Sequence, residues 1–208
     1  MNLLRHALED LHRADVLRRL ATGAAQGDVA AFLGAASQLT WVGGWADALR
    51  ALVALGTVPG AIQTAFRDAW EASASDALGL KRTLTLDLLC QDRLLLDGLA
   101  LLLPAPAGPT PVVLYRAQGM RDYRAGRVGC WWTPYREHAA ALWLATSAPV
   151  EHVGDWVLLE AQAQPGAIIH GTADDIEVVP DPSRLAVIRV VGVVGVRQGD
   201  PDAVNFAA

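Results

Sequence analysis

Residues 104–111 carry four prolines in eight positions, and this segment constrains the fold more than any other feature of the sequence. Proline lacks a backbone N–H and has a fixed φ, so such a segment neither continues a helix nor occupies the centre of a sheet. The pattern of apolar residues also differs on its two sides. We therefore expect two domains, residues 1–103 and 112–208, joined by a linker at 104–111.

The first hundred residues have the apolar spacing of amphipathic helices. Asp28 is a suitable N-cap for one helix, and Pro59 opens another. Residues 83–88 alternate as a strand would, but they lead into the helical spacing of residues 92–103, so we interpret both segments as helical. No sequence period is visible, and we expect an all-α domain that is either a helical bundle or a short helical-repeat stack.

Beyond the prolines, apolar residues occur in short runs that are typical of strands. The predicted strands are residues 112–117, 129–133, 156–162, 167–170, 176–179 and 185–196. One predicted helix, residues 134–145, begins with a proline in its first turn and interrupts the strands. Several strands with one internal helix favour an α+β fold over a parallel sheet with alternating crossovers.

Composition and charge exclude several classes of protein. The chain of 208 residues is 52% hydrophobic, which is ample for a core that needs no disulfide framework. Its two cysteines and five histidines lack metal-ligand spacing, so we expect no metal. A net charge of −5 argues against tight nonspecific binding to nucleic acid. The apolar runs are too short or too charged to span a membrane, residues 1–20 do not resemble a secretory signal, and we expect a cytoplasmic protein.

Three short motifs in the second part carry side chains suited to chemistry. Tyr115-Arg116 lies in the first predicted strand, residues 129–133 are Gly-Cys-Trp-Trp-Thr, and residues 175–178 are Asp-Ile-Glu-Val. Arginine suits a phosphate, a hydroxyl with aromatic rings suits a nucleoside, and a carboxylate stabilises a cationic sugar. Five arginines and two acids lie between residues 112 and 143, so this region would attract a small anionic ligand.

The order of these motifs resembles the ADP-ribosyltransferase superfamily, in the branch with an arginine strand, a serine or threonine strand and a glutamate strand. In that branch an aromatic-Arg start corresponds to Tyr115-Arg116, a Gly-x-Ser-Trp-Thr strand to residues 129–133, and a Glu-x-Glu-Val strand end to residues 175–178. The resemblance covers roughly the second half of the chain. It implies a split β-sandwich of two small sheets with NAD held between them.

Two positions depart from the family pattern. Trp131 stands where the family has its serine, so the hydroxyl role would pass to Thr133. Asp175 stands where the first glutamate of the acidic pair is expected, and its side chain is shorter by one methylene. These two departures affect the expectation of intact catalysis more than the expectation of family membership.

The resemblance implies a role for each motif residue. Glu177, Arg116 and Thr133 would be catalytic: Glu177 would stabilise the oxocarbenium-like ribose, and Arg116 would hold the pyrophosphate or ribose. Asp175 would position the acceptor. The expected NAD-binding residues are Arg116, Tyr115, Tyr123, Trp132 and Thr133.

Each of these residues also has a structural interpretation. Glu177 is suited to the exposed end of a strand, and Arg116 to a structural ion pair. Thr133 precedes a proline and suits the cap of the following helix, whereas Asp175 suits a turn. Aromatic residues such as Tyr123 and Trp132 are often core residues, and alternation along the strand would point Trp131 away from Trp132.

The leading hypothesis is a mono-ADP-ribosyltransferase that cleaves NAD and transfers ADP-ribose to a protein or nucleic-acid acceptor. Its layout is similar to bacterial or phage-encoded toxins and effectors, in which the helical domain would recognise a target or a neutralising inhibitor. A second hypothesis keeps the NAD site but makes water or phosphate the acceptor, which would give an NAD hydrolase-like depleter. A third, prompted by Trp131, is a degenerate domain that binds a nucleotide or a partner without catalysis.

Overall fold

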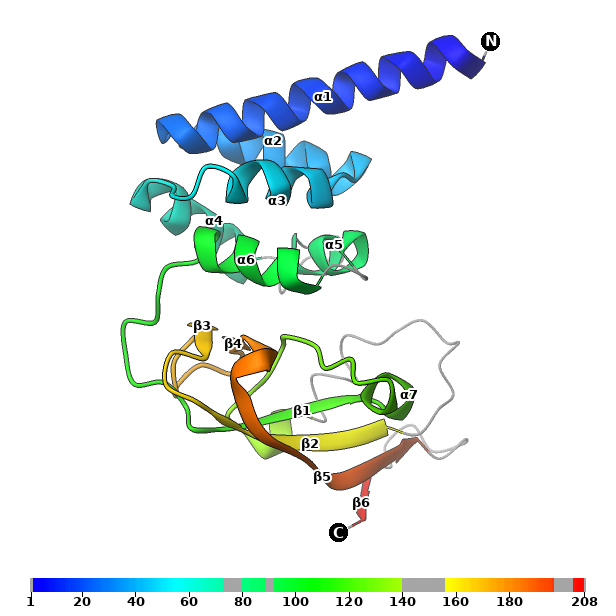
Figure 1. The fold of residues 1–208 in the computed structure, drawn as a ribbon, viewed down its shortest axis with the longest axis vertical. Helices are drawn as coiled ribbons and strands as arrows, with labels where there is room; N and C mark the ends of the chain where they lie inside the picture. The colour runs from blue at the N-terminus through cyan, green and yellow to red at the C-terminus, as the bar shows by residue number, and fades with distance from the viewer. Residues whose placement is uncertain (1, 73–79, 89–91, 140–155, 197–203, 208) are drawn as a thin grey trace. The chain divides into compact units, whose positions relative to one another are not determined.

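A computed structural model describes residues 2–72, 80–88, 92–139, 156–196 and 204–207. The chain divides into two compact units, Met1–Ala105 and Pro106–Ala208, and the division lies inside the proline-rich segment 104–111. The first unit is helical, and the second contains antiparallel sheets (Figure 1). The protein therefore has an α+β fold.

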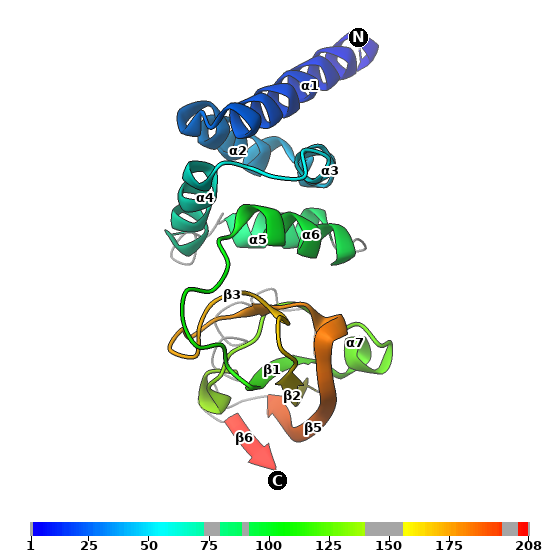
Figure 2. The same ribbon diagram turned by 60° about the vertical axis from the view of Figure 1, so that its left-hand side comes forward.

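The first unit is built from six helices among the described residues. They are α1 (Asn2–Gln26), α2 (Val29–Val42), α3 (Trp45–Val53), α4 (Gly60–Ala72), α5 (Leu80–Asp87) and α6 (Asp92–Leu102). Figure 2 shows the same helices from a second direction. The expected N-cap is confirmed, because the Asp28 carboxylate accepts a hydrogen bond of 3.0 Å from the Ala31 N–H. The helical interpretation of residues 83–88 is confirmed up to Asp87, which ends α5.

The core of the helical unit combines aromatic rings with close helix contacts. Phe66 stacks on Trp70 with ring centroids 5.8 Å apart and meets Phe32 of α2 at 6.4 Å. All three side chains are buried. A Cβ atom added to Gly98 would lie 2.6 Å from a methyl group of Leu49, so glycine permits α6 to approach α3 this closely.

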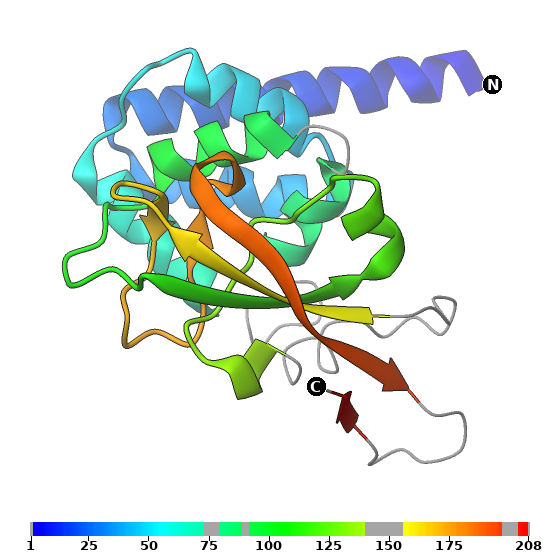
Figure 3. The same cartoon turned by 60° about the horizontal axis from the view of Figure 1, so that its bottom comes forward.

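The second unit contains two antiparallel sheets among the described residues. The larger has the order β1-β2-β5-β6, formed by β1 (Val113–Gly119), β2 (Trp156–Ala163), β5 (Leu185–Val196) and β6 (Val204–Ala207). Figure 3 shows β1, β2 and β5 side by side. The smaller sheet pairs β3 (Ile168–His170) with β4 (Val179–Pro180). A short helix, α7 (Met120–Arg124), follows β1, and the 3-10 turn η2 (Pro182–Arg184) precedes β5.

Several sequence predictions in this unit need correction. The predicted strand 129–133 is reduced to two isolated bridges at Trp132 and Thr133, and the predicted strand 176–179 begins at Val179, with one further bridge at Val178. Both segments are too short for their apolar pattern to define where pairing starts. The predicted helix 134–145 is helical at residues 136–139, and its remainder lies outside the described residues. Helix α7 and strand β6 were not expected.

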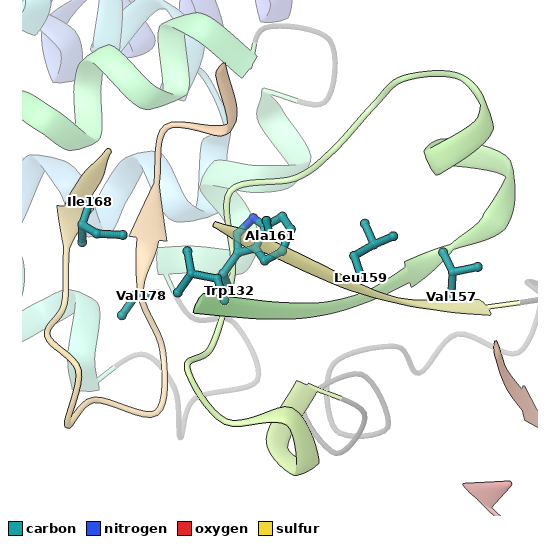
Figure 4. Packing of buried hydrophobic residues seen from close by; sticks show 7 residues of the cluster. Trp132, Val157, Leu159, Ala161, Ile168 and Val178 are labelled. Atoms are coloured by element: carbon teal, nitrogen blue, oxygen red, sulfur yellow. The ribbon is translucent and has the colours of Figure 1, made fainter. Parts of the chain in front are cut away.

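One apolar cluster packs the two sheets together. It is formed by Leu114, Trp132, Val157, Leu159, Ala161, Ile168 and Val178. Figure 4 shows how these side chains meet from β2, from β3 and from the segments that contain Trp132 and Val178. Alternate residues of β2 supply the cluster, as expected for one face of a pleated strand. None of the described helices is long and apolar enough to cross a membrane.

We predict that Asp28→Ala lowers the free energy of unfolding of the protein by about 1 kcal/mol, because the first turn of α2 loses its capping acceptor. Asp28→Ser should retain most of that stability, since a serine hydroxyl can accept the same bond. Urea denaturation monitored by circular dichroism would measure both variants. Equal midpoints for the alanine variant and the wild-type protein would show that this cap contributes nothing to folding.

Candidate functional site

The three sequence motifs are joined by two consecutive backbone bridges. Tyr115 of β1 exchanges both main-chain hydrogen bonds with Thr133, at 2.7 and 3.0 Å. The preceding residue, Trp132, exchanges both of its bonds with Val178, at 3.0 and 2.8 Å. The dipeptide Trp132-Thr133 therefore bonds to the arginine strand through Thr133 and to the glutamate segment through Trp132. Motifs some sixty residues apart in the chain lie on either side of this dipeptide.

The two bridges also determine which side chains share a face. Partners in an antiparallel bridge point to the same side, and successive residues point to opposite sides. Trp132 and Val178 point into the apolar cluster together with Leu114. Thr133 and Tyr115 therefore point to the opposite face, where Tyr115 packs with Leu158.

The same bridge brings the chain at Glu177 toward Thr133. The bridge between Trp132 and Val178 is isolated, but its antiparallel order puts the residue after Trp132 and the residue before Val178 on facing segments. Glu177 is half-buried. Its carbonyl lies close to Gly171, whose φ of +90° favours glycine, and a Cβ added there would lie 2.8 Å from the Glu177 oxygen. Gly171 thus lets the chain bring Glu177 to this position.

Arg116 follows Tyr115 and points to the opposite face of β1, toward the apolar cluster. Its Nη1 donates to the Trp131 carbonyl at 2.5 Å, and its Nε donates to Oε1 of Gln118 at 2.9 Å. Burial lowers the pKa of the Arg116 guanidinium, although it remains charged at every physiological pH. Arg116 therefore holds the main chain at Trp131.

The 129–131 segment lies directly against this guanidinium. A Cβ added to Gly129 would lie 2.7 Å from Cζ of Arg116. Glycine at this position therefore provides the space that the guanidinium occupies. Gln118 completes the arrangement, because its amide donates to the Arg127 carbonyl at 2.9 Å and its side chain is buried.

The hydroxyl of Thr133 has a local partner. It accepts a hydrogen bond of 3.1 Å from the Tyr135 N–H two residues on, a local turn that precedes the helix at 136–139. The side chain is almost fully buried. The Tyr135 hydroxyl in turn donates to the Ala173 carbonyl at 3.3 Å, in the loop that leads to Glu177. Tyr135 is 37% exposed, so part of its ring is open to a ligand.

Asp175 lies in a turn instead of on a strand face. Its carboxylate accepts two hydrogen bonds from Thr172, at 2.7 Å from the N–H and at 2.9 Å from the hydroxyl. The turn interpretation of Asp175 is therefore confirmed, because its side chain closes this turn. Its role toward an acceptor stays a prediction.

The aromatic residues expected to bind NAD divide between the two faces. Trp132 is 1% exposed, belongs to the apolar cluster and donates from Nε1 to the Gly129 carbonyl at 2.9 Å. Tyr123 of α7 packs against the same cluster. Trp132 is therefore a core residue, whereas Tyr115 lies on the side of Thr133.

Sequence inspection did not identify Glu160 as part of this region. Glu160 of β2 lies opposite Tyr115 and accepts hydrogen bonds from Arg189 of β5, at 2.9 Å from Nε and 2.5 Å from Nη2. Burial raises the pKa of the Tyr115 hydroxyl, and the charge of Glu160 with the hydrogen bond to it raises this pKa further. No local signal could have shown this, because Glu160 reaches Tyr115 only through strand pairing.

We predict that Gly129→Ala lowers the free energy of unfolding by about 1–3 kcal/mol, since the added methyl group must displace the Arg116 guanidinium. Gly119→Ala is the matched control, because the nearest atom to its added Cβ is a flexible Asp122 oxygen at 3.9 Å. Chemical denaturation of both variants measures the difference. An equal loss in the two proteins would contradict the packing of Arg116 against Gly129.

We predict that Tyr115 titrates above the ordinary tyrosine pKa of about 10. A raised pKa in the folded state favours the neutral phenol, so this stabilisation is fully present below pH 10 and is lost as the pH rises through the folded-state pKa. The chain has three tyrosines, and absorbance of phenolate against pH should show one late transition. Tyr115→Phe should remove it, and a late transition that persists in this variant would assign it elsewhere.

Comparison of the chain with protein-family models, with curated proteins and with solved structures gives no match. Similarity therefore assigns neither a family nor an activity. The geometry of residues 115–116, 132–133 and 177–178 is the remaining basis for a function.

Proposed function

We propose that this protein is an NAD-consuming mono-ADP-ribosyltransferase whose second unit is a split β-sandwich of the arginine, serine or threonine, and glutamate type. The observation that carries the proposal is the pair of consecutive bridges from Tyr115 to Thr133 and from Trp132 to Val178. They bring the motifs together in the order that the resemblance requires. Two sheets that share one core agree with the proposed architecture.

In this proposal Glu177 carries the chemistry. Cleavage of the bond between nicotinamide and ribose builds positive charge on the sugar, and a nearby carboxylate stabilises that state more than the ground state. Glu177 is half-buried, and its neighbour across the bridge is Thr133. Partial burial strengthens an interaction between charges, because less water screens it. The partly exposed ring of Tyr135 offers a surface on which nicotinamide can stack.

Arg116 supports the proposal less directly than Glu177 does. Two of its nitrogen atoms already bind the Trp131 carbonyl and the Gln118 side chain, and the side chain points toward the core. We assign it the task of holding the 129–131 segment, because its Nη2 also lies against Gly129. Trp131 stands where the family pattern has serine, so this position lacks the serine hydroxyl. The hydrogen bond from Arg116 still holds the main chain there.

The acceptor in this proposal is a protein or a nucleic acid, and the helical unit recognises that target or an inhibitor protein, as in a toxin or effector.

A binding protein without catalysis is the second candidate, favoured by Trp131 and by the local hydrogen bond that occupies the Thr133 hydroxyl. Purified protein incubated with radiolabelled NAD, with and without cell lysate, separates these functions. Label on a macromolecule supports transfer, and free ADP-ribose alone supports hydrolysis. Bound but intact NAD supports the binding role.

We predict that Glu177→Gln reduces NAD turnover by at least about a hundred-fold, in the range expected for loss of a catalytic carboxylate. The free energy of unfolding should change by less than about 1 kcal/mol, since the substitution preserves size at a half-buried position. Asp174→Asn, which removes an exposed acid from the same loop, is the matched control and should retain activity. Full turnover in Glu177→Gln would remove this residue from the mechanism.

A further inference from the structure

A polar row crosses the face of the large sheet that carries Tyr115 and Thr133. Tyr115 of β1 lies opposite Glu160 of β2, which lies opposite Arg189 of β5. Glu160 therefore faces the side of the sheet that carries Tyr115, and Arg189 donates to Glu160 from Nε and Nη2. Thr133 continues the row on the other side of Tyr115. Side chains from three strands and one bridging segment thus lie in one line.

A bulge in β5 is required for this row. Ala186 opposes Gln162 and Arg189 opposes Glu160, so β5 has two residues, Val187 and Ile188, where β2 has one. Regular pairing from Ala186 onward would place Ile188 opposite Glu160, and Arg189 would point into the core. The extra residue reverses both orientations. Ile188 packs against the apolar cluster, and Arg189 reaches Glu160.

The bulge is held at a conformational cost. Val187 has a φ of +51°, which is unfavourable for a β-branched side chain, and it is 65% exposed. Its side chain gains little from packing, so local burial does not explain the strain. Strained backbone of this kind persists where the surrounding structure requires it, often near functional sites.

We propose, on the basis of the function proposed above, that Glu160 and Arg189 are positioning residues of the NAD site. Glu160, oriented by Arg189, fixes the Tyr115 hydroxyl. Tyr115 exchanges both main-chain hydrogen bonds with Thr133, so a fixed Tyr115 fixes the segment that pairs with Val178 beside Glu177. The row therefore sets where the Glu177 carboxylate lies relative to the bound ribose.

The charged groups that face the Tyr115 hydroxyl determine how the test is designed. Glu160 is its cross-strand neighbour, and the charges of Arg136 and Glu137 act on it from the helix at 136–139. Arg189 acts through Glu160. Glu160→Gln removes one charge from this group and leaves an amide of the same size, so it separates charge from packing.

The experiment measures steady-state NAD consumption and the absorbance titration of tyrosine in the full-length protein. For Glu160→Gln and for Arg189→Ala we expect kcat to fall roughly ten-fold while the KM for NAD changes less than about two-fold, as for a misplaced catalytic group. In Glu160→Gln the late tyrosine transition should also move toward its ordinary pH. Arg184→Ala, which removes another exposed arginine of this unit, is the control and should leave both measurements unchanged.

Val187→Gly keeps the bulge and relieves its strain, so this variant should retain wild-type kinetics and titration. Val187→Gly changes β5 without removing a side chain of the row, so it shows whether the effects of the row variants come from the row or from a general disturbance of β5. Active wild-type protein with unchanged kcat in both row variants would overturn the positioning role alone. Wild-type protein that neither binds nor consumes NAD would overturn the proposed function, and this inference with it.

Discussion

The arrangement of the second unit depends on the main-chain hydrogen bonds of two residues, Trp132 and Thr133. Each exchanges a pair of bonds, one toward Val178 and the other toward Tyr115, so a dipeptide links the large sheet to the segment before β4. Buried peptide groups that find no partner are costly, and the segment satisfies its groups only when both neighbours are present. The contact between sheets and the assembly of the motifs therefore have the same physical origin.

The two residues of this dipeptide have different tasks because they point to opposite faces. Trp132 fills the apolar cluster, whereas Thr133 accepts a hydrogen bond from the Tyr135 N–H and pairs with Tyr115. Arg116 and Tyr115 divide in the same way, with Arg116 toward the core and Tyr115 toward the polar row. Alternation along a strand thus separates residues that stabilise the fold from those available to a ligand. The candidate site occupies the face on which apolar burial is less complete.

The accuracy of sequence-based prediction differed between the units for a physical reason. The cap at Asp28, the helix after Pro59 and the helical character of residues 83–87 depend on contacts within a few positions, and all were predicted correctly. The bounds of residues 129–133 and 176–179 were wrong because two-residue pairings have no local periodicity. The turn at Asp175 was predicted correctly, since its carboxylate bonds to Thr172 only three residues away. The residue types at the candidate site could be predicted, but the face of the sheet on which each side chain lies could not.

The order and identity of the motif residues, the helical character of the first unit and the change of structure at the proline-rich segment were present in the amino-acid sequence, since local patterns encode them. Three features appeared only in the folded chain: the position of Glu177 beside Thr133, the contact of Arg116 with the Trp131 carbonyl, and the row from Tyr115 through Glu160 to Arg189. Each depends on strand register. One extra residue at Val187 changes which side chains meet, and register is settled by the burial of whole faces and not by neighbouring residues.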